Sequence, residues 1–563
     1  MMDIKLNPNE LIKANSRYLR GSLKESIADQ ASGALSPDDA QICKFHGIYE
    51  QDDRDQRRSR QQQFLEPYYS FMLRVRLPGG VCTPQQWLTI DGVGRDLGNG
   101  TIRLTTRQTF QYHGILKANL KPLIKRINQV MIDSIGGCGD VNRNVLCNPN
   151  PDDSALHYEV QQWATRISEH LLPKTRAYHE IWLDGETVAG GESEPLYGET
   201  YLPRKFKTAI AIPPHNDVDV YTNDLGFVAI AEAHRLLGFN VLAGGGMGAT
   251  HDDCTTFPRL ADELGFISPE QTLAVAEAVV AVQRDFGDRI SRRHARLKYT
   301  IERMGLLRFK TEVEKRAGLR FEALKPASFT SQGDRYGWLQ DSTGQWHLTL
   351  YIENGRITDI PEASLMSGLR EIASIHEGDF RITPNQNLIV ARVSGQQKAR
   401  IEQLAREHGL LSDQRSQTRL ASIACVALPT CPQAMAEGER YFPELMNQIE
   451  QLSSGYGIDK EAIVMRVTGC PNGCARPYVA EIGVIGKGPG RYNLQLGGDG
   501  RGLRLNRLYR KNLNVHELLK TLDSLFKLYA EKRLANEGFG DFTIRYGLVK
   551  PVINPAEDYH DTP

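Results

Sequence analysis

The sequence lacks the features that mark membrane-spanning, secreted or strongly charged proteins. Its most apolar helical stretch, residues 273–282, is short and contains Glu277, so no transmembrane span is predicted. Lys and Arg number 68, as do Asp and Glu, and this net charge of zero gives no reason to expect binding to nucleic acid or to an anionic membrane. The first residues form no apolar signal segment. We therefore expect a cytoplasmic protein.

The length and the composition predict several domains. The chain has 563 residues, 40% of them hydrophobic, which is enough for three or more domains with ordinary cores. Strand-like and helix-like segments are mixed along it, which indicates an α+β (mixed α/β) fold. The predicted strands cover 69–77, 101–111, 207–213, 240–243, 464–467 and 482–485, and the predicted helices cover 87–97, 224–237, 268–286, 294–304 and 515–535.

Four of the nine cysteines form two close pairs, Cys425-x5-Cys431 and Cys470-x3-Cys474. Clustered thiolates indicate disulfides, a zinc site or an iron–sulfur cluster. Disulfides fit poorly, because nothing marks the chain as secreted. Zinc sites usually use C-x2-C or C-x4-C, whereas the separate corners of a four-iron cluster accept wider spacings. The spacing therefore favours an iron–sulfur cluster, with zinc and packed reduced thiols as alternatives.

The second cysteine pair encloses Pro471 and Gly473, which predict a tight turn. Such a turn exposes backbone N–H groups that can bond to sulfur and tune a cluster's potential. We interpret the remaining, scattered cysteines as reduced packing residues: Cys43, Cys82, Cys138, Cys147 and Cys254.

An internal repeat predicts the architecture. Residues 100–108 (GTIRLTTRQ) align without gaps on residues 378–386 (GDFRITPNQ), 278 positions later. Residues 239–245 (FNVLAGG) align in the same way on residues 492–498 (YNLQLGG), 253 positions later. Two pairs in the same order indicate two related halves. A duplicated fold can place a cofactor on its pseudo-twofold axis, with each half supplying one wall.

Several motifs resemble those of the sirohaem-dependent sulfite and nitrite reductases. The cysteine motif Cys425-x5-Cys431 with residues 468–474 (TGCPNGC) carries the first likeness. Further segments that resemble the family extend over essentially the whole chain: 44–49 (KFHGIY), 52–55 (DDRD), 140–147 (DVNRNVLC), 201–207 (YLPRKFK) and 538–543 (GFGDFT).

The resemblance implies an internally duplicated, pseudo-twofold three-domain fold that holds sirohaem and a 4Fe–4S cluster. It makes Cys425, Cys431, Cys470 and Cys474 the cluster ligands, with Cys474 also bridging to the sirohaem iron. The implied reaction is the six-electron reduction of sulfite to sulfide in sulfate assimilation and cysteine biosynthesis. The implied electron donor is an NADPH-oxidising flavoprotein alpha subunit with FAD and FMN. Ferredoxin-linked reduction of nitrite (or sulfite) by the same cofactors is the alternative.

On this basis the chain divides into four regions. We expect a partly extended, partner-facing N-terminal extension over 1–68 and duplicated ferredoxin-like half-domains over 69–145 and 339–411. We expect an α/β sirohaem and substrate domain over 146–338 and an α/β domain with the cluster over 412–563.

Cations for a small anion occur in suitable pairs. Arg74 and Arg76 lie two residues apart on a predicted strand, as do Lys205 and Lys207, so each pair shares a face. The resemblance selects Arg74, Arg143, Lys205 and Lys207 as the anion-binding set, and Arg76 stays an ordinary surface cation. In the family pattern, nitrite reductases tend to have Asn where this chain has Lys207. A second ammonium suits sulfite, which has more oxygens and more charge than nitrite.

Sirohaem has eight carboxylates, each of which needs a cation, a hydrogen-bond donor or water. Candidates from the repeated strands and from the basic segment 291–298, interpreted as a helix, are Arg103, Arg107, Arg296, Lys298 and Arg381, and Asn472 lies between two of the paired cysteines. His113 ends a strand and is interpreted as a packed or hydrogen-bonded residue, not a haem ligand.

The glycine-rich segment 242–249 satisfies G-x-G-x-x-A after a strand, but no helical pattern follows it. The duplicated glycines fit close backbone approach to a shared macrocycle better than a nucleotide, so we expect no NADPH site on this chain.

Two interpretations of another class compete. A zinc-stabilised scaffold or binding protein leaves the Arg and Lys set and the duplication unexplained. An iron–sulfur dehydratase usually leaves one iron without a cysteine ligand, whereas four cysteines are present here.

Overall fold

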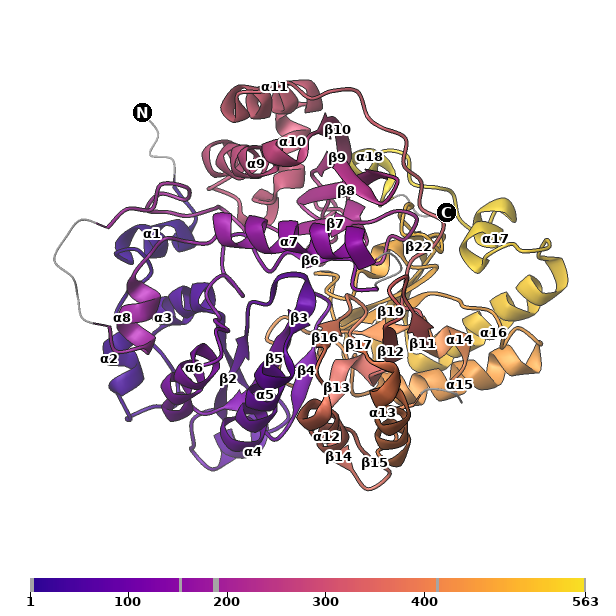
Figure 1. The fold of residues 1–563 in the computed structure, drawn as a ribbon, viewed down its shortest axis with the longest axis horizontal. Coiled ribbons are helices and arrows are strands. Elements are labelled where there is room, and N and C mark those ends of the chain that lie inside the picture. The colour runs from indigo at the N-terminus through magenta and orange to yellow at the C-terminus, as the bar shows by residue number, and fades with distance from the viewer. Residues whose placement is uncertain (1–4, 151–153, 186–191, 412–414, 561–563) are drawn as a thin grey trace.

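The computed structural model describes residues 5–150, 154–185, 192–411 and 415–560 (Figure 1). Within these residues the chain forms four five-stranded sheets and one two-stranded ribbon, β14 (Asp359–Ile360) with β15 (Ala363–Ser364). None of the helices in the described ranges is long and apolar enough to cross a membrane.

Two of the sheets belong to the half-domains and have the same strand arrangement. The first has the order β1-β2-β5-β4-β13 and the second β11-β12-β17-β16-β3, so each strand has a counterpart in the other half. Their bounds are β1 Ile48–Asp52, β2 Tyr69–Arg74, β4 Ile102–Leu104, β5 Phe110–Ile115 and β13 Arg356–Ile357, and β11 Gly337–Gln340, β12 Trp346–Leu350, β17 Leu388–Val393, β16 Asp379–Ile382 and β3 Val81–Cys82.

The half-domains exchange their last strands. β3 comes from the first half but pairs with β16, and β13 comes from the second half but pairs with β4. Gly80 and Gly355, one residue before each exchanged strand, have φ of +76° and +74°. A Cβ on either glycine would lie within 3 Å of a backbone oxygen of the other half, so close approach requires glycine. This exchange fixes the pseudo-twofold relation between the halves.

Helices cover the outer faces of these two sheets. α5 (Pro84–Leu97) begins with a capping box from Thr83 and Gln86 and buries Trp87, whose ring stacks on Phe380 of the second half at 4.7 Å. α5 packs against α12 (Leu365–Ile375), its counterpart in the second half-domain, across the pseudo-twofold axis. The other helices of the half-domains are α6 Leu120–Asn128 and α13 Gly395–Glu407.

The other two sheets form the two α/β regions. Their orders are β10-β9-β8-β7-β6 and β22-β21-β20-β19-β18, each with three parallel strands followed by two antiparallel ones. The bounds are β6 Leu146–Cys147, β7 Thr208–Ala211, β8 Leu225–Glu232, β9 Arg235–Ala243 and β10 Asp262–Ile267, and β18 Ile423–Ala424, β19 Met465–Thr468, β20 Ile482–Gly488, β21 Arg491–Leu496 and β22 Arg507–Leu513.

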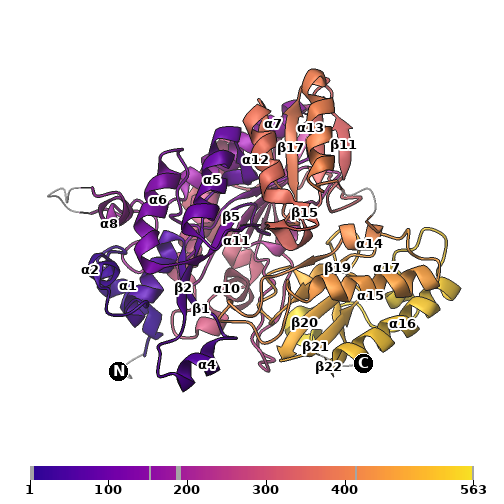
Figure 2. The ribbon, with the colours of Figure 1, turned by 90° about the horizontal axis from the view of Figure 1, so that it is seen from below.

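Helices pack on both α/β sheets. In the first region α7 contacts β9 and α9, and α9 contacts α11. In the second, α15 and α16 lie together along one face of the sheet (Figure 2). The bounds are α7 Ser154–His170, α8 Ala177–Trp182, α9 Thr272–Phe286, α10 Leu297–Met304, α11 Leu306–Ala317, α14 Gln417–Leu420, α15 Phe442–Gly455, α16 Val515–Lys532, α17 Phe539–Arg545 and α18 Pro555–Asp558.

The N-terminal segment is joined to the first half-domain. β1 is the edge strand of the first sheet and pairs with β2, so residues 48–52 are part of a domain and not only of an extension. His46 is fully buried: its Nε2 lies 2.8 Å from the Leu19 carbonyl oxygen, and its Nδ1 accepts from Trp182 Nε1 at 3.1 Å. The helices of this segment are α1 Pro8–Asn15, α2 Leu23–Ala28, α3 Pro37–Ile42 and α4 Arg57–Gln62.

Two predicted elements were wrong. The strand expected over 101–111 is two strands, β4 and β5, joined by a tight turn. The helix expected over 224–237 is the hairpin of β8 and β9, with Ala233 and His234 at φ of +48° and +64° in the turn. Residues 225–230 are all buried, and a strand covered on both faces gives a continuous apolar run that periodicity does not distinguish from a buried helix.

The basic segment 291–298, expected as one helix, is a short 3-10 turn (Arg292–His294) followed by α10. The other predicted strands and helices were confirmed within a few residues at their ends.

Candidate active site

The four paired cysteines line one cavity of about 440 Å³ where the half-domains and the α/β regions meet. Arg74 lines it from the first half-domain, Gln386 from the second, and Lys205 from the first α/β region. The cysteines belong to the second α/β region. All four parts of the duplicated fold therefore contribute to this cavity.

The cysteine loops leave the same edge of the second α/β sheet. Cys425 directly follows β18, and Cys470 follows β19 after Gly469. β18 and β19 are parallel neighbours, so both loops emerge at the carboxyl ends of adjacent strands. This is the edge at which parallel sheets bind ligands.

Backbone and side-chain donors reach the sulfurs. The Gly469 N–H donates to Cys425 Sγ at 3.3 Å, and Asn472 Nδ2 donates to Cys470 Sγ at 3.7 Å. Gly473 has φ of +64°, and the predicted tight turn in the second cysteine motif is confirmed. Donors of this kind stabilise negative charge on thiolates and raise the potential of a bound cluster.

Burial raises the pKa of the Cys425 and Cys431 thiols, and that of Cys470 to about 12. The charge of Cys474 is the next largest cause in each case. These thiols therefore keep their protons until a metal group binds, and binding releases protons.

The spread of the cysteines suits a cluster better than one ion. Within the part of the chain that the structure describes, no three His, Cys, Asp or Glu side chains form a group that could hold a metal ion. A four-iron cluster has a different requirement, because each thiolate binds a separate iron. Four cysteines along a cavity wall meet that requirement better than the closed tetrahedron of structural zinc.

Cys474 lies between the other thiols and a pair of lysines. It is exposed to the cavity, whereas Cys470 is buried. Its charge acts on the pKa values of the other three cysteines and also of Lys205 and Lys207. A group bound to Cys474 would therefore lie close to both the other thiols and the lysines.

The cavity wall is strongly cationic. Its lining contains eight Lys or Arg residues and no Asp or Glu among the described residues. Two of them have carboxylate partners outside the lining, Arg103 with Glu439 and Arg292 with Asp140. The remaining excess of like charges is costly unless an anion is present. A macrocycle with eight carboxylates and a small anionic substrate fit this wall. The eight cations are Lys44, Arg74, Arg103, Arg107, Arg143, Arg204, Lys205 and Arg292.

Three of the four predicted anion-binding residues, Arg74, Arg143 and Lys205, line this cavity, whereas Lys207 is not among its lining residues. Arg143 is held by its Nε, which donates to the Gly139 carbonyl at 2.8 Å, and Arg74 Nη1 lies 3.5 Å from Cys138 Sγ. Lys205 lines the wall with them. Lys207 is half-buried two residues later, where the charge of Lys205 acts on it.

The two lysines have lowered pKa values. Burial, followed by the charges of Arg204 and Arg296, lowers the pKa of Lys205 to about 7. Burial, followed by the charge of Lys205, holds the pKa of Lys207 well below its usual range. An anion between them would raise both pKa values, so anion binding is coupled to proton uptake at the Nζ atoms.

Two predicted macrocycle contacts already have carboxylate partners. Arg103 Nε lies 2.7 Å from Glu439, and Arg296 Nη2 lies 2.7 Å from Asp224. Arg103 still lines the cavity. Although burial opposes it, the charges of Arg103 and Arg356 lower the pKa of Glu439 to about 2. These ion pairs fix the guanidinium groups in place.

The other three predicted cationic contacts differ in position. Lys298 is fully buried outside the cavity lining, and its Nζ donates to the Gly248 carbonyl at 2.7 Å. Arg107 lines the cavity, donates to Asn223 Oδ1 at 2.8 Å and has its pKa lowered to about 9 by burial and then by Arg143. Arg381 pairs with Asp379 at 2.9 Å and does not belong to the cavity lining. Its proposed role as a macrocycle contact gains no support from this position.

Arg76 and His113 were predicted to take no part in binding the anion or the haem. Arg76 was expected to be an ordinary surface cation, but its side chain is only 15% exposed and pairs with Asp133 at 2.5 Å. His113 is buried at the cavity, and within the described residues neither ring nitrogen has a hydrogen-bond partner. The packed part of the His113 interpretation is confirmed, and the hydrogen-bonded part is not.

Sequence reasoning missed several lining cations and one loop contact. Lys44, Arg204 and Arg292 line the cavity but were given no role, although each lies in a segment that was singled out. Arg54, in the motif 52–55, donates from Nη1 to the carbonyl oxygens of Ala434 at 2.7 Å and Cys431 at 3.4 Å. The motif itself was the signal, but its partner is far away in the sequence.

The glycine-rich segment 242–249 approaches the cysteine loop. The Ala249 N–H donates to the Pro471 carbonyl at 3.0 Å. No helix begins in the residues that follow, 250–254, as the sequence predicted. The glycines therefore serve close packing beside the Cys470–Cys474 turn.

Comparisons with known proteins agree with this site. The family model described as "Nitrite/Sulfite reductase ferredoxin-like half domain" matches residues 65–130 and 339–409, and "Nitrite and sulphite reductase 4Fe-4S domain" matches residues 162–321. The second match covers the α/β copy without the paired cysteines.

Curated relatives match over the full chain. The "Sulfite reductase [NADPH] hemoprotein beta-component" of Thiocapsa roseopersicina is 64% identical and that of Shewanella sp. (strain ANA-3) 58% identical, with 100% of this chain and of each relative covered. The solved structure of the Mycobacterium tuberculosis NirA protein has the same fold, with a TM-score of 0.79, 24% identity and 96% coverage of each chain. The chain belongs to the nitrite and sulfite reductase family.

Proposed function

We propose that this chain is the catalytic haemoprotein of an assimilatory, NADPH-dependent sulfite reductase. The observation that carries the proposal is a cavity with four cysteines at one wall and eight cations, with no Asp or Glu among its described lining residues. When bound, sirohaem and a 4Fe–4S cluster supply the redox chemistry. Cys425, Cys431, Cys470 and Cys474 would hold the cluster, and Cys474 would also hold the sirohaem iron.

The chain's own residues bind the substrate and supply protons. Arg74, Arg143, Lys205 and Lys207 would hold the sulfite oxygens and offset their charge. Reduction to sulfide adds six electrons and releases the three oxygens as water, so protons must reach the site repeatedly. The pKa of Lys205, lowered to about 7, suits proton exchange near neutral pH.

Sulfite is proposed as the preferred substrate because Lys205 and Lys207, once protonated on anion binding, would offer two ammonium groups to one small anion. Nitrite, with one charge and two oxygens, needs fewer cations. Reduction of nitrite by the same site is the second candidate, and the electrostatics favour it less.

We propose an NADPH-oxidising flavoprotein with FAD and FMN as the electron donor, because the curated relatives are named as the beta-component of an NADPH enzyme. The glycine-rich segment 242–249 lacks the helix that a nucleotide phosphate needs. We also propose that the protein works in the cytoplasm.

The test is product analysis with a chemically reduced donor and the purified chain. We expect one sulfide for every six electrons consumed, faster than ammonia forms from nitrite, and no NADPH oxidation until the flavoprotein is added. Faster reduction of nitrite, or NADPH consumption by the chain alone, would contradict the assignment.

A further inference from the structure

The two α/β regions contain the same unusual backbone feature. Asp219 and Arg476 both have left-handed φ, +46° and +55°, and each precedes a 3-10 turn, Val220–Thr222 and Pro477–Val479. Left-handed backbone is uncommon for a residue other than glycine and persists where its surroundings fix it. The two residues are 257 positions apart and occupy equivalent places in the two copies.

The hydrogen bonds around these two residues also match. The Asp219 N–H donates to the carbonyl three residues before it at 3.0 Å, and that of Arg476 does the same at 2.9 Å. The carbonyls of Asp219 and Arg476 in turn accept from the N–H groups three residues later, at 2.8 and 3.4 Å. The duplication has therefore kept the turn while the side chain became acidic in one copy and basic in the other.

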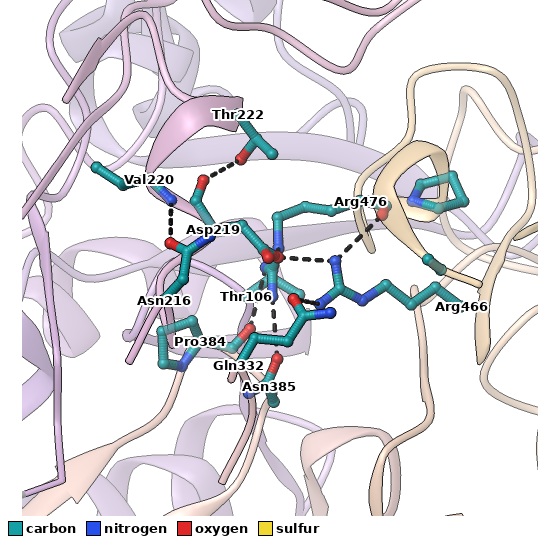
Figure 3. Close-up of polar contacts among 12 residues, drawn as sticks. Thr106, Asn216, Asp219, Val220, Thr222, Gln332, Pro384, Asn385, Arg466 and Arg476 are labelled. Carbon is teal, nitrogen blue, oxygen red and sulfur yellow. Dashed lines mark hydrogen bonds and ion pairs between the residues drawn. The ribbon is translucent and has the colours of Figure 1, made fainter. Parts of the chain in front are cut away.

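The two equivalent side chains bind each other. Arg476 Nε lies 2.5 Å from Asp219 Oδ2, and Arg466 Nη1 lies 2.7 Å from the same oxygen. Asp219 has no exposed surface, and Arg476 is 6% exposed. Figure 3 shows both guanidinium groups converging on this carboxylate. The charge is enclosed between the two copies, where it is screened little.

The rest of the Arg476 guanidinium binds the second half-domain. Nη1 donates to the Pro384 carbonyl at 3.1 Å and Nη2 to Asn385 Oδ1 at 3.0 Å (Figure 3). The equivalent turn of the first half-domain holds the same loop, because Thr106 Oγ1 donates to the Cys474 carbonyl at 3.1 Å. Thr106 and Pro384 are equivalent in the repeat of residues 100–108 on 378–386.

These contacts surround Cys474. It lies within the turn closed by Arg476 N–H and the Gly473 carbonyl, so any movement of Arg476 moves it directly. We propose that Asp219 and Arg476 are a positioning pair that fixes the backbone of Cys474, and that a thiolate shared by two metal groups needs this placement. The proposal rests on the proposed function, in which Cys474 joins the cluster to the sirohaem iron.

The experiment uses the full-length holoprotein. It follows the release of iron to an added iron chelator at a temperature well below that of unfolding. R476M and D219N should release iron about 10-fold to 100-fold faster than the wild type, in line with the loss of metal affinity when a partner of a metal ligand is removed. They should also shift the sirohaem absorption bands. R476K, which keeps the charge but not both outer bonds, should be intermediate.

The matched control is R419M. Arg419 is 3% exposed, bonds to Glu450 at 2.7 Å and to Glu353, and joins the cysteine region to the second half-domain away from Cys474. R419M should lower the unfolding temperature and leave the iron release rate and spectrum unchanged. N385A removes one outer bond of Arg476 together with the bond from Asn385 Nδ2 to Asp334 Oδ1. It gives a measurable variant if R476M does not fold, and should speed release to a smaller extent.

Three outcomes separate the claims. Wild-type iron release and spectra in R476M, D219N and N385A would overturn the positioning pair, and so would equal acceleration in R419M. A wild-type protein without sirohaem bands and four non-haem irons would overturn the proposed function instead.

Discussion

The two α/β regions have the same sheet but carry their functional residues at opposite ends of it. In the first region, Arg143 precedes β6, and Lys205 and Lys207 precede β7. In the second, Cys425 follows β18 and Cys470 follows β19. The strand registers agree, since Leu225 pairs with Ala243 as Ile482 pairs with Leu496. Duplication thus kept the framework, and the loops diverged into one set that carries Arg and Lys residues and another that carries the paired cysteines, both at one cavity.

The N-terminal segment contacts both copies, in different ways. It reaches the first through the buried bond between His46 and Trp182, and the second through Arg54 at the loop of Cys431. Each α/β region is therefore hydrogen-bonded separately to the N-terminal segment.

The largest expected effect comes from removing the Cys474 thiol. C474S should lose both cluster and sirohaem, because the proposed bridging ligand would belong to both, and sulfite turnover should fall to background. The measurement is iron content and the absorption spectrum of the purified variant. C254S, at an exposed cysteine away from the pairs, is the control and should match the wild type. A normal sirohaem spectrum in C474S would disprove the bridging role.

The contribution of the buried contact between His46 and Trp182 to stability should depend on pH. Burial lowers the pKa of His46 from 6.5 to about 4, so the folded protein binds fewer protons than the unfolded chain between these values. The contribution of neutral His46 is therefore complete above pH 6.5 and is lost as the pH falls towards 4. The free energy of unfolding should drop by about 3 kcal/mol from this group over that interval.

Denaturant unfolding of H46Q at several pH values checks this. Glutamine keeps one donor and one acceptor but does not titrate, so the curve should flatten between pH 6.5 and 4. H516Q, at an exposed histidine, should keep the wild-type slope. An unchanged slope in H46Q would show that other groups cause the acid sensitivity.

The preference for sulfite over nitrite should depend on Lys207. K207N removes one ammonium beside the cavity, and sulfite turnover should fall about 100-fold, a usual loss for one donor to a developing charge. Nitrite turnover should fall less. The measurement is kcat/KM for both substrates with one chemical donor, with K527N on the exposed face of α16 as control. Equal losses for sulfite and nitrite would remove the electrostatic argument for sulfite.

The smallest expected effect comes from removing the hydrogen bonds between Arg54 and the loop of Cys431. R54M removes a charged donor from the carbonyls of Ala434 and Cys431, and unfolding should become easier by about 2 kcal/mol. R58M, at an exposed arginine four residues later, should change little. Denaturant midpoints compare the two. Equal midpoints for R54M and R58M would mean that the loop of Cys431 is held by other contacts.

Local patterns in the sequence predicted much of the fold. The repeat of 100–108 on 378–386 was visible because both copies place the same turn between paired strands. The turn at Pro471 and Gly473 was visible because proline and glycine restrict the backbone in known ways. The mistaken helix at 224–237 shows where this fails: burial of a strand on both faces removes the alternation that identifies strands.

Long-range partners could not be predicted in the same way. Arg54 and Ala434 are 380 residues apart, and Asp219 and Arg476 are 257 apart. Nothing in either neighbourhood says which distant group will neutralise a charge, since that depends on how the sheets pack. For the same reason Arg103 and Arg296 were expected to be open to an anionic macrocycle, whereas the structure pairs them with Glu439 and Asp224.

The most direct test of the account is the absorption spectrum and metal content of the purified chain, oxidised and then chemically reduced, with sulfite and nitrite added in turn. The account predicts sirohaem bands that shift when sulfite is added, together with about four non-haem irons per chain. A colourless protein that contains zinc would mean that the four cysteines are structural, and would contradict the assignment of the cavity as a site of sulfite reduction.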